Sequence, residues 1–150
     1  MTLGNAYDNL YQAMLKEKNE EKAIEYFNEA KNYHEQAIAK DPANVDAVYS
    51  VGALYYNKAA FRTQEMSALP EDFSAAGIKR LNDMRNLIMG FFEQALPYFQ
   101  KAESLAPNDL NTLIALSEIY ARKEDELSIE FKRRLEVVKA GGKNPTPYFR

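Results

Sequence analysis

Residues 95–120 read ALPYFQKAESLAPNDLNTLIALSEIY, and this stretch joins the end of one predicted helix to the start of the next. In the first half, Ala95, Phe99 and Ala102 recur at helical spacing, and Pro107 closes the helix. The second half carries a set with the spacing i, i+3, i+4 and i+7, namely Leu113, Leu116, Ser117 and Tyr120. A similar set with the same spacing occurs earlier in the chain, at Val48, Val51, Gly52 and Tyr55. A recurring small–aromatic–small code closed by proline is typical of helical repeat proteins.

This pattern resembles the tetratricopeptide repeat (TPR) family, whose unit is a pair of antiparallel helices. The resemblance implies an all-α fold, a right-handed α-solenoid of three TPR-like helical hairpins with a C-terminal capping helix. It makes residues 1–139 a single domain with units of about 1–42, 43–107 and 108–139, and it leaves residues 140–150 as a flexible tail. The first unit matches the pattern less regularly, through Leu3, Gly4, Tyr7, Ala30, His34, Ala37 and Pro42.

The apolar periodicity predicts six helices and an elongated middle hairpin. Tyr55 and Ala95 lie 40 positions apart, where the family pattern separates them by nine. Apolar residues continue through this insertion, so we expect ordered helix over 59–90, with the extension of the first unit covering part of it. The six helices are expected at about 2–18, 20–40, 43–67, 71–105, 108–123 and 126–139.

The last predicted helix has one apolar stripe and one charged face, which suits a terminal capping helix. We expect Leu127, Phe131, Leu135 and Val138 to face inward, and Glu130, Lys132, Arg133, Arg134 and Glu136 to face outward. His34 is the one histidine in the sequence, and it falls on an apolar helix stripe. We therefore expect it to pack in the core, with no role as a metal ligand or a catalytic base.

Composition narrows the classes of function. The net charge is −3 and the isoelectric point is about 5.3, which argues against a nucleic-acid partner. The absence of cysteine excludes a disulfide framework and a thiolate metal site. No apolar run is long enough to span a membrane, and no signal peptide opens the chain. The abrupt start indicates a piece of a longer protein, so both cytoplasm and periplasm stay open as its location.

The TPR resemblance also implies a binding groove, because the first helix of each unit lines the concave face in that family. The corresponding positions here are Asn5, Asp8, Asn9, Asp46, Tyr49, Ala53, Tyr56, Asn57, Asn111, Ile114, Glu118 and Arg122. Tyrosine offers a large contact area with a polar tip, which suits peptide recognition. The alternative is that these side chains merely cover the groove. The basic residues with which some family members hold chaperone C-termini are missing, so we do not expect that partner.

The leading interpretation is a non-enzymatic interaction module or scaffold that binds a peptide or a partner helix of another protein through the groove and the long hairpin. On that hairpin the predicted contact residues are Phe61, Met66, Ile78, Leu81 and Met84. One alternative is a structural element that forms a homodimer through the hairpin, and another is an accessory domain of a larger protein. No constellation of catalytic or ligand residues stands out, so we expect neither an enzyme nor a cofactor or metal.

Overall fold

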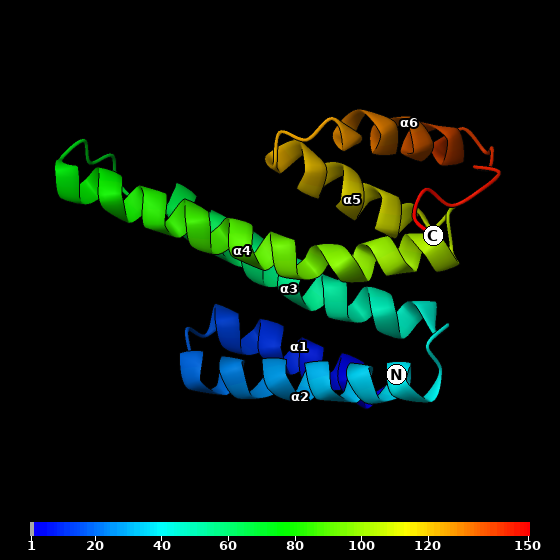
Figure 1. The fold of residues 1–150 in the computed structure, drawn as a ribbon. Coiled ribbons are helices and arrows are strands. Elements are labelled where there is room, and N and C mark those ends of the chain that lie inside the picture. The colour runs from blue at the N-terminus through cyan, green and yellow to red at the C-terminus, as the bar shows by residue number, and fades with distance from the viewer. Residues whose placement is uncertain (1) are drawn as a thin grey trace.

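Six helices make up the protein over residues 2–150, which is the part that this computed structural model describes (Figure 1). All of the regular secondary structure among these residues is helical, so the predicted all-α class is confirmed. The predicted helix positions are also confirmed, with differences confined to a few residues at the ends. The helices are α1 (Leu3–Lys16), α2 (Glu20–Lys40), α3 (Val45–Ser67), α4 (Ala75–Leu105), α5 (Leu110–Arg122) and α6 (Leu127–Lys139).

Polar side chains fix where most of the helices begin. The first turn of a helix leaves backbone N–H groups without internal partners, and a side-chain oxygen just before the helix accepts from one of them. Asn44 does so for α3 by accepting from the N–H of Ala47 at 3.0 Å, and Asp109 does so for α5 at 2.8 Å. Equivalent caps start the other three of the first five helices, at Thr2, Asn19 and Ser74.

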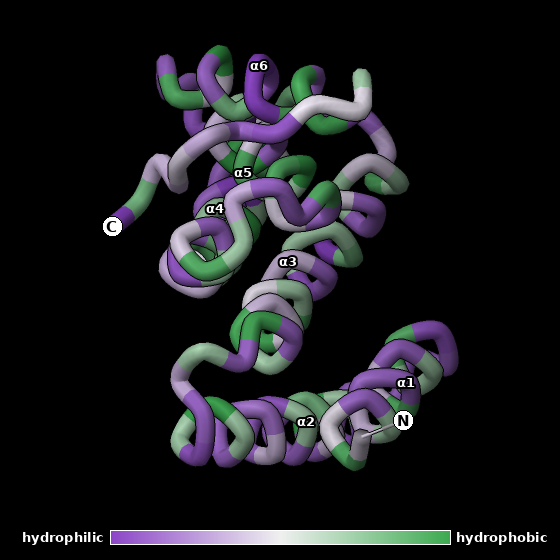
Figure 2. The backbone as a smooth tube through the Cα atoms, turned by 90° about the vertical axis from the view of Figure 1, so that its right-hand side faces the viewer, coloured by the Kyte–Doolittle hydropathy of each residue, from purple (hydrophilic) through white to green (hydrophobic). Residues whose placement is uncertain are grey.

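The helices pack in the order of the chain. α1 lies against α2, α3 against α4 and α5 against α6, while α2–α3 and α4–α5 contacts join each pair to the next. Figure 2, which looks at one end of the helices, shows these pairs one above another. With 23 and 31 residues, α3 and α4 are long, and their outer ends extend beyond both neighbouring pairs (Figure 1). The expectation of ordered helix over 59–90 is met except at the turn, residues 68–74.

Two clusters of apolar side chains form the core. The larger joins α3 and α4 to α5 and α6, with Phe92, Phe99 and Phe131 at its centre. The smaller joins the first pair to α3 through Tyr11, Ala23, Phe27, Ala30 and Leu54, and Tyr55 packs against both clusters. The core of each pair is therefore continuous with that of its neighbours in the chain.

The C-terminal segment makes specific contacts, where the sequence indicated only a flexible tail. Residues 143–150 return to the body of the protein, and the N–H groups of Tyr148 and Phe149 donate to the carboxylate of Glu103 at 2.7 and 3.0 Å. Glu103 is fully buried. Farther back along the segment, Asn144 is buried and its N–H donates to Asn108 Oδ1 at 2.6 Å. The segment therefore covers the ends of α4 and α5.

The predicted outward face of α6 is wrong at Arg134. It was expected in solvent, but it is buried, and its guanidinium lies 3.4 Å from Glu103 and donates to the carbonyl oxygen of Thr146 at 2.9 Å. The physical reason is the C-terminal segment, which covers this side of α6 and supplies polar partners there. A buried cation requires such partners, because desolvation without them costs several kcal/mol.

Candidate functional site

The predicted groove residues lie on the first helix of each pair. Asn5, Asp8 and Asn9 are in α1. The predicted residues from Asp46 to Asn57 are in α3, and those from Asn111 to Arg122 are in α5. They fall into two classes by exposure. The exposed residues are Asn5, Asn9, Asp46, Asn111, Glu118 and Arg122, and the partly buried residues are Asp8, Tyr49, Ala53, Tyr56, Asn57 and Ile114.

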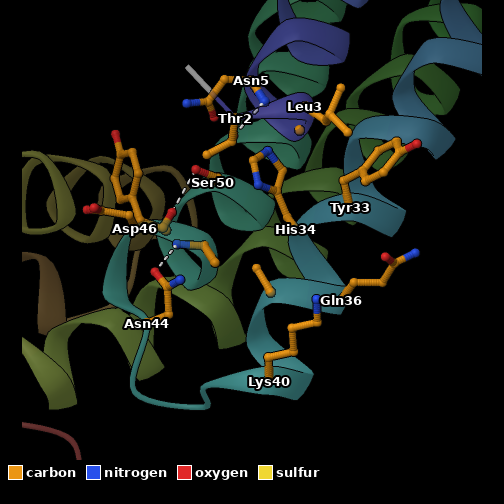
Figure 3. Close-up of a pocket in the computed structure, with 14 residues that line it drawn as sticks. Thr2, Leu3, Asn5, Tyr33, His34, Gln36, Lys40, Asn44, Asp46 and Ser50 are labelled. Carbon is orange, nitrogen blue, oxygen red and sulfur yellow. Dashed lines mark hydrogen bonds between the residues drawn. The ribbon is translucent and has the colours of Figure 1, made fainter.

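A pocket of about 610 Å³ brings part of this set together (Figure 3). It lies between the start of α1, the second half of α2 and the start of α3, and Asn5, Asp46 and Tyr49 all line it. Asp8, Asn9 and the α5 residues do not. The α2 side was not foreseen as a site, and its contribution to the lining is Tyr33, His34, Gln36, Ala37 and Lys40.

The lining of this pocket mixes polar and apolar side chains and carries little charge. Asn44 and Thr2 cap α3 and α1 at its edge, and Ser50 Oγ donates to the carbonyl oxygen of Asp46 at 2.7 Å. Its charged members are the basic Lys40 and the acidic Asp46, one of each sign. Amides, hydroxyls and one pair of opposite charges match the donors and acceptors that a peptide main chain presents.

His34 lines the inner part of the pocket and packs as the sequence predicted. It is 5% exposed, and its ring lies so close to Gly4 that a Cβ atom there would be 2.5 Å from Cε1. Burial lowers the pKa of His34, and the charge of Asp8 opposes that shift in part. Burial also raises the pKa of Asp8, with a hydrogen bond from Gln12 acting the other way. Burial therefore disfavours the charged form of each group relative to the free side chain.

The α3 and α5 residues of the groove meet in a second place. The hydroxyl of Tyr56 donates to the carboxylate of Glu118, and the Tyr56 ring meets Phe92 edge-on at 5.4 Å. The guanidinium of Arg122 lies 5.0 Å from the centre of the same Phe92 ring. Tyr49 packs edge-on against a neighbouring core ring, Phe99, at 5.5 Å. Both tyrosines are therefore held on their inner side and stay partly open on the other.

The five contact residues predicted on the long hairpin lie in different surroundings. Phe61 is partly buried and faces the first pair across a hollow that Leu15 and Ala23 also line. Met66 and Leu81 line another hollow near the turn, which Ile78 shares. Ile78 is 49% exposed, while Met84 lines a shallow surface hollow on the outer flank of α4. That hollow also contains Leu87, which sequence reasoning missed because it lies off the inward stripe.

No protein-family model, no curated protein and no solved structure matches this chain. Among residues 2–150, no group of three or more His, Cys, Asp or Glu side chains could hold a metal ion. Nor does any helix within that range combine the length and apolar character needed to cross a membrane. The function is therefore assigned from the geometry of the pocket between α1, α2 and α3 and of the contacts around Tyr56 and Glu118.

Proposed function

We propose that the protein is a TPR-like solenoid that binds an extended peptide segment of another protein along the face of α1, α3 and α5. The supporting observation is the pocket that brings Asn5 of α1 together with Asp46 and Tyr49 of α3. These residues were selected from the repeat pattern alone, and they come from different pairs of helices. A face built from the first helix of each pair is the arrangement that the TPR resemblance implies.

The chemistry of the pocket favours a peptide as the ligand. Asn5, Asn44 and Gln36 each offer an amide, which donates and accepts and so suits both main-chain groups of an extended segment. Tyr49 adds a ring that is already held by Phe99, so little side-chain entropy is lost on binding. The one histidine, the usual general base, is buried against Gly4, and we therefore assign the module a binding role without catalysis.

A selection from a displayed library of random peptides tests this function. Peptides selected on the parent protein should bind Asn5→Ala and Asp46→Ala variants roughly tenfold more weakly or worse, because each loses a polar contact in the pocket. Asn28→Ala is the matched control, since Asn28 is exposed on α2 and does not line the pocket. Failure to select any peptide, or equal affinity for the parent and both pocket variants, would overturn the proposal.

A further inference from the structure

The outer part of α4 has a flank that the rest of residues 2–150 leaves exposed. It belongs to the section of the long hairpin that extends beyond both neighbouring pairs (Figure 1). Six residues line a shallow hollow on this flank, and they are Ala76, Lys79, Arg80, Asp83, Met84 and Leu87. Leu87 is 50% exposed, and Phe73, at the turn just before the helix, is 82% exposed.

The flank has the spacing of a helix–helix seam. Ala76, Arg80, Asp83 and Leu87 follow one another at intervals of four, three and four residues, which keeps them on one side of the helix. A further three residues along α4, Gly90 lies on the same side, whereas Phe73 precedes the helix and lines the hollow at the turn. An added Cβ atom at Gly90 would meet nothing within 4 Å, so the surface above this glycine is open.

The order of residues along the seam is self-complementary. A two-fold axis passing between residues 81 and 82 would place Arg80 of one helix opposite Asp83 of an antiparallel copy, and it would do so twice. The same axis pairs Ala76 with Leu87, a small residue with a large one. A symmetric dimer requires this kind of self-matching surface, in which each patch meets its own equivalent.

We propose that a second copy of this chain occupies the flank, with the two α4 helices packed antiparallel about this axis. Charge complementarity favours a second copy as the occupant, because the two-fold axis places Arg80 of each copy opposite Asp83 of the other. Lys79 already lies 2.7 Å from Asp83 within one chain, so each carboxylate would then lie between two cations. The contact spans only the segment from Ala76 to Leu87 on each helix. Because small interfaces bind weakly, the fraction of dimer should rise with protein concentration. This inference is independent of the peptide-binding groove.

Charge reversal at the seam tests the dimer by sedimentation equilibrium. The parent should show a monomer–dimer equilibrium, and Arg80→Asp and Asp83→Arg should each weaken it roughly tenfold or more, because each sets like charges opposite one another. A mixture of the two variants should form a heterodimer, since all of its charge pairs are again opposite in sign. Arg85→Asp is the control, because it makes the same charge change at an exposed residue of α4 off the seam.

Circular dichroism should first show that the Arg80→Asp, Asp83→Arg and Arg85→Asp variants are as helical as the parent. Each sedimentation result then supports or contradicts the dimer. A parent that stays monomeric at high concentration would overturn the proposal. So would a dimer that Arg80→Asp leaves unchanged, because another surface would then form it. If both variants are monomeric but their mixture does not associate, the antiparallel pairing is wrong.

Discussion

At the scale of single residues, Gly4 sets how closely α1 approaches α2. A Cβ atom at this position would lie 2.5 Å from Cε1 and 2.8 Å from Nε2 of His34, a buried ring with little room to retreat. We expect Gly4→Ala to lower the free energy of unfolding by about 1–3 kcal/mol in urea denaturation. Gly90→Ala is the matched control, where the free energy should stay constant or rise by up to about 1 kcal/mol. Equal effects of the two substitutions would contradict this packing.

His34 should also make stability depend on pH. Its usual pKa is 6.5, and burial lowers the pKa in the folded protein, so the unfolded state binds more protons below pH 6.5. The contribution of His34 to the free energy of unfolding should therefore be largest above about pH 6.5. It should fall as the pH drops toward the pKa of the folded state. The shift at Asp8 has the opposite sign. Its folded pKa is raised above 3.8, so its contribution to stability is full below about 3.8 and is lost as the pH rises through the folded pKa.

Urea denaturation at several pH values between about 7.5 and 5 measures the effect of His34. Because the sequence has one histidine, His34→Gln should remove most of the slope in this range, whatever it does to stability at neutral pH. A variant that keeps the slope of the parent would show that another group is responsible.

At the scale of elements, the C-terminal segment acts as the cover of the last pair. The buried carboxylate of Glu103 accepts from the N–H groups of Tyr148 and Phe149 and lies next to the guanidinium of Arg134. Glu103→Ala would leave both N–H groups without their acceptor and would remove one of the two carboxylates beside that cation, which keeps Glu130 at 2.9 Å. We expect the free energy of unfolding to fall by about 3–5 kcal/mol. Glu136→Ala is the control and should stay within about 0.5 kcal/mol, because the Glu136 side chain is 70% exposed.

Deleting residues 143–150 separates the cover from the ion pair. The deletion should also destabilise the protein and should expose Phe131, which stacks on Phe149 with ring centres 5.6 Å apart. Increased binding of a hydrophobic dye would report that exposure. A truncated protein as stable as the parent would show that the segment adds nothing to the fold.

These elements also show what sequence reasoning reaches. Helix positions follow from local signals, namely capping side chains such as Asn44 and Asp109 and the period of the apolar stripes, so they could be predicted. The C-terminal segment has no such period, and its contacts join residues 45 and 46 positions apart, as between Glu103 and Tyr148 or Phe149. The burial of Arg134 depends on those contacts and was missed with them. Likewise, the repeat pattern selected Asn5 and Tyr49, but the α2 side of the pocket depends on how two pairs meet.

At the scale of the whole molecule, contacts between neighbours in the chain leave the long hairpin unevenly supported. Its inner half packs against both adjacent pairs, with Phe92, Ala95, Phe99 and Ala102 buried. Phe61, on the α3 side, still faces the first pair across a hollow. Farther out, most residues of the segment 75–87 of α4 are exposed.

This unequal support predicts a gradient of amide hydrogen exchange along α4. Residues 75–87 should exchange faster than residues 92–102, because opening the outer turns breaks few buried contacts. If the α4 flanks pair, exchange of residues 75–87 should slow as the protein concentration rises, whereas that of 92–102 should not change. The Arg80→Asp variant should keep the fast exchange at every concentration. Mass spectrometry of the exchanged protein measures both segments at once, and uniform protection along α4 at low concentration would contradict the gradient.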